Sequence, residues 1–109
     1  MTLNLPASLE TYFAAANTDD ADRIADCFTP DAIVRDEDHH ISGRAAIRAW
    51  AFESRRKYCF HAQPMSVDEG ADKTVVKAHL TGDFPGNPLD LNYRFTLADG
   101  KISALETAL

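Results

Sequence analysis

The sequence predicts one α+β domain in which helices pack on one face of a strongly curved, mostly antiparallel sheet, in the order ααβαββββ. Apolar residues recur at helical spacing in the first half of the chain and alternate with polar residues through the second half. No linker, repeat or low-complexity tract divides the 109 residues, so a single domain over 1–109 is expected. A curved sheet that wraps its helices closes a cone, and the open end of a cone is a natural apolar pocket.

Three helices are expected before residue 58. The first covers about residues 6–16 and begins on a proline, and the Asn17-Thr18 turn after it can also cap the next helix. The second ends at the Thr29-Pro30-Asp31 segment. The third opens at Ser42-Gly43, and its last turn holds three cations typical of a solvated helix end: Arg55, Arg56 and Lys57.

Five strands are expected. The first covers 32–36 and is followed by a polar loop at 37–41. The second, 58–67, contains Pro64, which has no N–H for the ladder and therefore indicates an edge strand or a bulge. Alternating polarity and the turn signals at 85–88 and Asp99-Gly100 predict the other strands, which cover 73–84, 89–97 and 101–109.

Composition excludes several classes of function. The net charge of −6 disfavours nucleic acid and anionic membranes as partners. The sequence shows no secretory signal and no membrane-spanning apolar run, so a cytoplasmic protein is expected. Cys27 and Cys59 are too few for a disulfide framework or a metal clip. No phosphate-binding or dinucleotide-binding motif appears, so no cofactor is expected.

Four segments, in order, resemble the ketosteroid isomerases and the SnoaL-like branch of the NTF2-like superfamily. They are residues 12–20, 28–36, 42–50 with its Gly-x-x-Ala-Ile pattern, and 93–102 with Tyr-Arg-Phe followed by Asp-Gly. Together they span nearly the whole chain. The resemblance implies the NTF2-like, or cystatin-like, cone and a homodimer formed through the outer face of the sheet.

The resemblance also implies roles for two residues. Tyr12 falls on the family's oxyanion-binding tyrosine, and Asp36 falls on its general base. The second carboxyl group of the family's oxyanion hole should stand two positions before the aromatic-Arg-Phe segment, where this chain has Leu91. A leucine donates no hydrogen bond, and loss of one such donor commonly costs about 10²–10³ in rate. Steroid isomerisation itself is therefore not expected.

Several other residues are candidates for the pocket wall. We expect apolar or aromatic contacts with a ligand from Trp50, Phe60, Leu91, Tyr93 and Phe95, together with His39. The run Asp36-Glu37-Asp38-His39-His40 is either an exposed polar loop, the favoured interpretation, or a source of a histidine base, and a metal site is not expected there. His79 should face outward, towards the dimer interface, and Glu106 is a reserve candidate if its register slips by one.

Two functional hypotheses remain. In the first, a small apolar carbonyl compound enters the cone, Asp36 removes a proton α to the carbonyl, and Tyr12 stabilises the enolate. This is isomerase or SnoaL-like cyclase chemistry without a cofactor. In the second, the cone only binds a ligand, or the dimer is an interaction module. Leu91 favours the second hypothesis, whereas Tyr12 and Asp36 favour the first.

Overall fold

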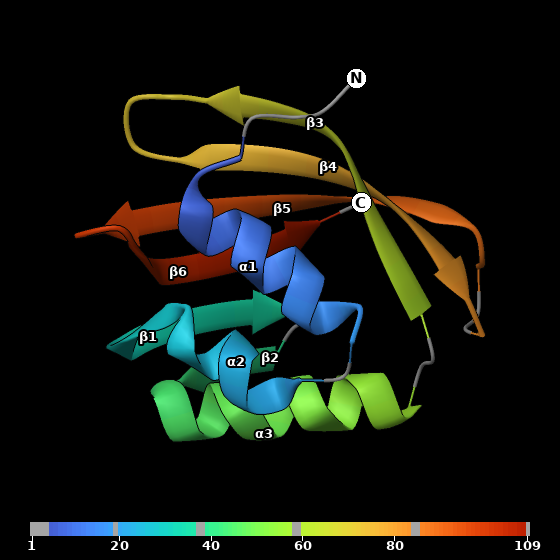
Figure 1. Cartoon of the computed structure of the whole chain (residues 1–109), viewed down its shortest axis with the longest axis horizontal. Helices are drawn as coiled ribbons and strands as arrows, with labels where there is room; N and C mark the ends of the chain where they lie inside the picture. Colours follow the sequence, from blue (N-terminus) through green and yellow to red (C-terminus); the bar gives the residue numbers. More distant parts are fainter. Residues whose placement is uncertain (1–4, 19, 37–38, 58–59, 84–85, 109) are drawn as a thin grey trace.

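The structure is a computed structural model that describes residues 5–18, 20–36, 39–57, 60–83 and 86–108. Figure 1 shows its elements. Their bounds are α1 Ala7–Ala16, α2 Ala21–Asp26, β1 Phe28–Asp36, β2 His39–Ser42, α3 Arg44–Lys57, β3 Phe60–Glu69, β4 Thr74–Gly82, β5 Leu89–Ala98 and β6 Lys101–Ala108. The side chains of the predicted cationic helix end, 55–57, and Cys59 lie outside the described residues.

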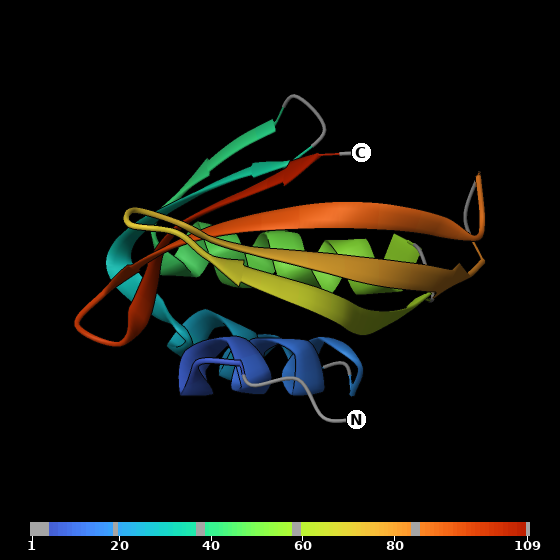
Figure 2. The ribbon, with the colours of Figure 1, turned by 90° about the horizontal axis from the view of Figure 1, so that it is seen from above.

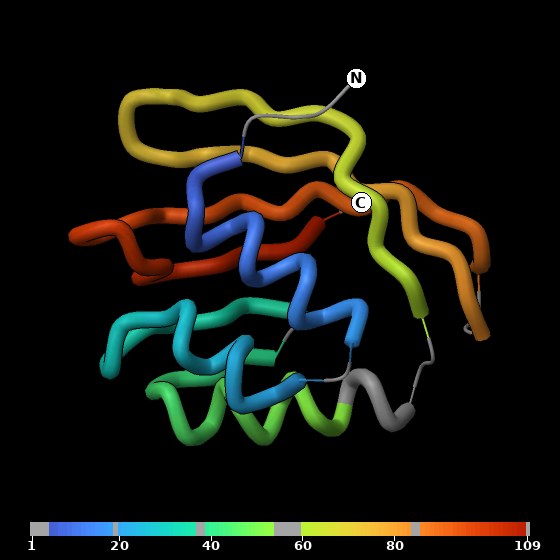
Figure 3. The backbone as a smooth tube through the Cα atoms, in the orientation of Figure 1, coloured from blue at the N-terminus to red at the C-terminus, as the bar shows by residue number. Residues whose placement is uncertain are grey.

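The six strands of the described chain form one sheet in the order β2-β1-β6-β5-β4-β3. β1 and β6 pair in parallel, and the other neighbours are antiparallel. The parallel pair brings two segments far apart in the sequence side by side, as the tube in Figure 3 shows. Figure 2 shows that the sheet is strongly curved and that α1 and α2 lie on one side of it. The predicted α+β architecture is therefore confirmed.

The predicted element order is wrong in one place. The expected polar loop at 37–41 contains β2, which pairs with β1 from Ile33–Ser42 to Asp36–His39, so the order is ααββαββββ. β2 is a short edge strand whose side chains are mostly exposed. Its residues lack the apolar alternation that marks a half-buried strand. The strand is held by backbone hydrogen bonds, which do not depend on side-chain polarity, so the sequence does not indicate it.

The start of β1 also differs from the prediction. The expected helix end at Thr29-Pro30-Asp31 is already strand, because α2 ends at Asp26 and β1 begins at Phe28. The pairing of β1 with β6 is irregular between Phe28 and Ile33. Pro30 lies in this irregular stretch, where the strand tolerates a residue without an N–H.

The Asn17-Thr18 turn has a different role from the predicted cap. Asp20 caps α2, because its Oδ1 accepts the Arg23 backbone N–H at 3.1 Å. Asn17 instead bonds both backbone groups of Ala62 at 2.9 Å: its Nδ2 donates to the carbonyl oxygen, and its Oδ1 accepts from the N–H. Asn17 therefore joins the end of α1 to β3.

Two turn predictions are confirmed. β3 is an edge strand, and its register against β4 shifts between Pro64 and Ser66, so Pro64 lies both at an edge and at a bulge. The hairpin from β5 to β6 turns at Asp99 and Gly100, whose φ angles are 53° and 81°. Positive φ at both central residues is the signature of a type I′ turn, which matches strand twist.

Candidate functional site

The inner face of the sheet is organised in rows that cross neighbouring strands. Directly paired residues point to the same face, so the register defines each row. Near the β5–β6 hairpin, one row runs Thr74, Phe95, Leu105 and Val34 from β4 to β1. All four are buried. This row forms the closed end of the concave side.

The next row carries the polar groups. It pairs Val76 with Tyr93 and Tyr93 with Thr107. Arg35 of β1 pairs with Glu106 of β6, so the residues that follow them, Asp36 and Thr107, are neighbours in the same row. Val76 and Tyr93 are buried, whereas Thr107 and Asp36 are half-buried. Beyond this row, Leu91 and then Leu89 are also half-buried. Along β5, exposure thus increases from Phe95 to Leu91 and Leu89, whereas their β4 partners Ala78 and Leu80 stay buried.

Asp36 is held by two hydrogen bonds from different elements. The Thr107 hydroxyl, on β6, donates to Asp36 Oδ1 at 2.6 Å. The Trp50 indole N–H, on α3, donates to Asp36 Oδ2 at 3.1 Å. A carboxylate has about four lone-pair sites, so each oxygen retains one for a further partner. The half-buried carboxylate is therefore fixed in orientation and still able to accept a proton.

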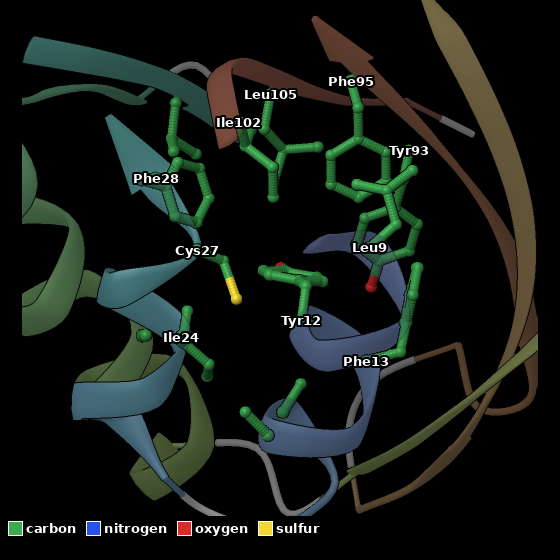
Figure 4. Close-up of a cluster of buried hydrophobic side chains, with 14 of the residues drawn as sticks. Leu9, Tyr12, Phe13, Ile24, Cys27, Phe28, Tyr93, Phe95, Ile102 and Leu105 are labelled. Atoms are coloured by element: carbon green, nitrogen blue, oxygen red, sulfur yellow. The ribbon is translucent and has the colours of Figure 1, made fainter. Parts of the chain in front are cut away.

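Tyr12 lies in the aromatic cluster beside this carboxylate. Its ring makes edge contacts with the rings of Phe13, Phe28, Tyr93 and Phe95 at centroid distances of 5.2–6.2 Å. Figure 4 shows it in the middle of the labelled side chains, between those of β5 and those around Cys27 and Phe28. The exposed fraction of Tyr12 is 5%. The ring is therefore a core residue, and α1 fixes its position.

Burial and charge keep both inner tyrosines protonated. Burial, followed by Tyr93 and Asp36, raises the pKa of Tyr12 well above its ordinary value of 10.0. Burial, followed by Asp36, also raises the pKa of Tyr93. A negative charge disfavours a second negative charge nearby, so Asp36 is close enough to affect both phenols. Each phenol is a hydrogen-bond donor at neutral pH.

The predicted wall residues divide into two groups. Trp50, Phe60 and Leu91 are half-buried and pack against the core, so each leaves some surface open. Tyr93 and Phe95 are buried and stack on one another with ring planes 10° apart. The first group lies at the more open end, whereas Phe95 lies in the closed row.

The remaining candidates lie away from the inner face. His39 is exposed, and its Nδ1 is 3.2 Å from the Asp36 carbonyl oxygen, so it contacts the backbone and not the carboxylate. His40 is exposed and pairs with Arg35. Glu106 forms an ion pair with Arg94 at 3.3 Å, and both residues lie on the outer face, next in sequence to the inward Thr107 and Tyr93. His79 pairs with Asp90 at 2.8 Å between β4 and β5.

Thr107 is the site residue that sequence reasoning missed. Its contact with Asp36 spans 71 positions and depends on the parallel pairing of β1 with β6. Trp50 was predicted as an apolar residue of the pocket wall, and its indole N–H adds a polar role because it donates to the Asp36 carboxylate. Within the described ranges, no three His, Cys, Asp or Glu residues gather in a way that could hold a metal ion. No helix of the described chain has the length and hydropathy needed to cross a bilayer.

Comparison with known proteins gives matches over nearly the whole chain. Residues 9–105 match the family model of the SnoaL-like domain. A Sinorhizobium meliloti protein, provisionally described as a polyketide cyclase, is 36% identical, superposes with a TM-score of 0.91, and is aligned over 95% of each chain. No match was found among curated protein sequences.

Two further solved structures are more distant. SalBIII, an epoxide hydrolase/cyclase-like enzyme of pyran ring formation in the polyether salinomycin, is 25% identical with a TM-score of 0.77, over 92% of this chain and 85% of that one. A Catenulispora acidiphila protein with a ketosteroid isomerase-like fold, in complex with trimethylamine, is 15% identical with a TM-score of 0.86, over 97% and 87%. These solved structures share the fold that the sequence resemblance implies for this chain.

Proposed function

Because the chain belongs to the SnoaL-like domain family and has the NTF2-like fold, we propose that it binds an apolar carbonyl compound and catalyses its isomerisation or cyclisation without a cofactor. The observation that carries this proposal is the Asp36 carboxylate. It is held by two donors at the boundary between the tyrosine cluster and the half-buried apolar residues Trp50, Phe60 and Leu91.

The proposed reaction begins with proton transfer to Asp36. The carboxylate takes a proton from the carbon α to the carbonyl, the C–H bond breaks, and its electron pair moves to the carbonyl oxygen. The Tyr12 hydroxyl donates a hydrogen bond to this developing enolate oxygen. Its raised pKa keeps it a donor throughout. An isomerase then returns the proton to another carbon, whereas a cyclase uses the enolate carbon to close a ring.

Tyr93 is proposed as a further contact for the same oxygen. Leu91 supplies no donor, but Tyr93 lies two residues along the same face of β5 and carries a protonated phenol. Its ring centroid is 6.2 Å from that of Tyr12. A hole with two phenols differs from one with a phenol and a carboxylic acid, which supports a substrate other than a steroid.

The similar proteins support a small-molecule function of this kind. The Sinorhizobium meliloti protein is provisionally described as a polyketide cyclase, and SalBIII acts in ring formation. The Catenulispora acidiphila protein holds a small molecule, trimethylamine. An apolar carbonyl compound is a substrate class that agrees with the polyketide cyclase description and with one fixed carboxylate.

A non-catalytic binding function is the second candidate, and Leu91 is the observation that favours it. In that case the cone holds a ligand, Asp36 and the phenols provide only polar contacts, and no C–H bond breaks. Both candidates predict ligand binding at Trp50, Phe60 and Leu91, whereas the buried Phe95 and the exposed His39 lie outside this proposed contact set. They differ in whether a proton is transferred.

Further features of the proposal concern assembly and location. A homodimer through the outer face of the sheet, which carries the His79–Asp90 and Arg94–Glu106 pairs, is proposed, as is a cytoplasmic location without nucleic-acid or membrane partners. Sedimentation velocity tests the assembly directly. A monomer at every concentration would refute it, independently of the chemistry.

The test of the site uses an equilenin-type phenol, which mimics an enolate. We expect tight binding to the wild type, with a perturbed ionisation of the phenol, and a loss of about tenfold or more in Tyr12→Phe, because a hydrogen bond to a charged oxygen is lost. Thr81→Val, on the exposed outer side of β4, is the matched control. Absence of binding to the wild type would remove the enolate-binding role and leave the ligand-binding candidate.

A further inference from the structure

We infer that Thr107 and Trp50 are positioning residues for Asp36, that they make its two oxygens unequal, and that Oδ1, bonded to Thr107, is the oxygen that gains and loses the proton. This inference rests on the proposed function for its catalytic consequence. The hydrogen-bonding arrangement itself is a property of the structure.

The two donors differ in what they can do when Asp36 becomes protonated. A tryptophan indole N–H is a donor only, so Oδ2 accepts the 3.1 Å bond from Trp50 in both states, and it accepts best as the carbonyl oxygen of the protonated acid. A threonine hydroxyl is both donor and acceptor and can rotate. The 2.6 Å bond from Thr107 to Oδ1 can therefore reverse when Oδ1 becomes a hydroxyl group.

The reversal keeps every hydrogen bond of the carboxyl group satisfied in both states. In the carboxylate, Thr107 donates to Oδ1 and Trp50 donates to Oδ2. After a C–H bond of the substrate breaks, the proton forms an O–H bond on Oδ1, and the electron pair stays on the substrate. Oδ2 then becomes the carbonyl oxygen and still accepts from Trp50. Return of the proton to the substrate restores the first state.

The fold holds both partners rigidly. Thr107 lies on β6 opposite Tyr93, in the row that ends at Asp36, so three neighbouring strands fix its position. Trp50 lies in the middle of α3, which packs on β1 and β2. Asp36 is the last residue of β1, where backbone pairing alone would leave its side chain free to rotate. Two side-chain hydrogen bonds, one from β6 and one from α3, remove that freedom.

The lone tryptophan of the sequence provides a readout that needs no substrate. Its single indole N–H resonance reports directly on the Asp36 carboxylate in a ¹H–¹⁵N spectrum. We expect Thr107→Val, which keeps the shape and removes the hydroxyl, to move this resonance. Thr107→Ser should restore it, and the outer-face control Thr81→Val should leave it unchanged. If Thr107→Val does not fold, Thr107→Ala provides the same comparison.

Turnover of nitrobenzisoxazole supplies the second readout, since one base removes its C–H proton and the N–O bond breaks to give a coloured phenolate. We expect Thr107→Val and Trp50→Phe each to lower kcat roughly tenfold or more with little change in KM, because a hydrogen bond to a charged group is lost. Thr107→Ser should recover most of the lost rate.

The two readouts separate the possible failures. An indole resonance that moves in Thr107→Val, together with no turnover by the wild type, would support the arrangement around Asp36 and overturn the proposed chemistry. An indole resonance that is the same in wild type and Thr107→Val would overturn the inference, as would wild-type kcat in that variant. A shift with reduced kcat that Thr107→Ser reverses would support both.

Discussion

The two ends of the concave side differ in how they use the same strands. The closed end is a buried row that leaves almost no exposed surface for a ligand to cover: Thr74, Phe95, Leu105 and Val34. One row further, the same strands carry Asp36, Thr107 and Tyr93, and beyond them lies half-buried Leu91. The strands therefore provide stability near the hairpin, and the binding surface that we propose lies away from it.

This division explains why a polar cluster is tolerated next to the core. Burial of an unpaired carboxylate is costly, but Asp36 is only half-buried and has two donors. The donors lie on α3 and β6, two elements that also contribute buried residues to the core. Substitutions at the two ends should consequently have opposite profiles, with large stability losses at one and large functional losses at the other.

The largest expected difference in stability is between Phe95→Ala and Leu91→Ala, two residues apart on one strand. Phe95 is fully buried and contacts three aromatic rings, so its loss should cost about 3–5 kcal/mol in the free energy of unfolding. Leu91 is half-buried, and its loss should cost about 1–2 kcal/mol. Urea denaturation measures both. Equal costs would contradict the division between the two ends.

Alkaline unfolding should reveal the buried phenols at the boundary. Because the folded-state pKa values of Tyr12 and Tyr93 are raised, the stabilisation from keeping them protonated is fully present below the ordinary value of 10.0 and is lost as pH rises above it. Each tyrosine should contribute a slope of up to about 1.4 kcal/mol per pH unit there. Tyr12→Phe and Tyr93→Phe should each flatten the decline. A wild-type curve that coincides with both variants above pH 10.0 would show that the phenols are accessible.

A smaller effect than that of Phe95→Ala is expected at the junction of α1 with β3. Asn17→Ala removes both side-chain bonds to the Ala62 backbone, so the free energy of unfolding should fall by about 1–3 kcal/mol. Thr18→Ala, whose exposed hydroxyl bonds only within its own helix end, is the matched control. Thermal unfolding of the two variants side by side measures the difference. If Asn17→Ala kept wild-type stability but lost binding of the equilenin-type phenol, the junction would instead shape the proposed site.

Sequence patterns predicted the elements that combine burial with regular spacing. β4 and β5 alternate apolar and polar residues, and the buried positions Val76, Ala78, Tyr93 and Phe95 follow that alternation. β2 was missed because its residues are polar and its pairing uses the backbone. The start of β1 was misplaced because Pro30 is typical of a helix end, although it also suits an irregular strand.

The functional roles of the predicted site residues stay predictions, whereas the structure adds contacts around them that the sequence did not indicate. Family resemblance located Asp36 and Tyr12, and the structure places both on the concave side, with Asp36 raising the pKa of Tyr12. The contacts that orient Asp36 depend on which strands are neighbours, and a parallel pairing across 71 positions leaves no local pattern in the sequence. The roles of the wall residues Phe60, Leu91 and Phe95 remain predictions.

The most direct measurement of the central claim is turnover of nitrobenzisoxazole by the wild type, Asp36→Asn and Asp90→Asn. Thr107 can reverse its bond to accept from the amide of Asp36→Asn, so that variant should fold normally. Asp90 is an exposed carboxyl group on the outer face and serves as the control. We predict turnover by the wild type and Asp90→Asn and a loss of at least about 10² in Asp36→Asn. Equal rates in all three proteins would contradict a catalytic role for Asp36.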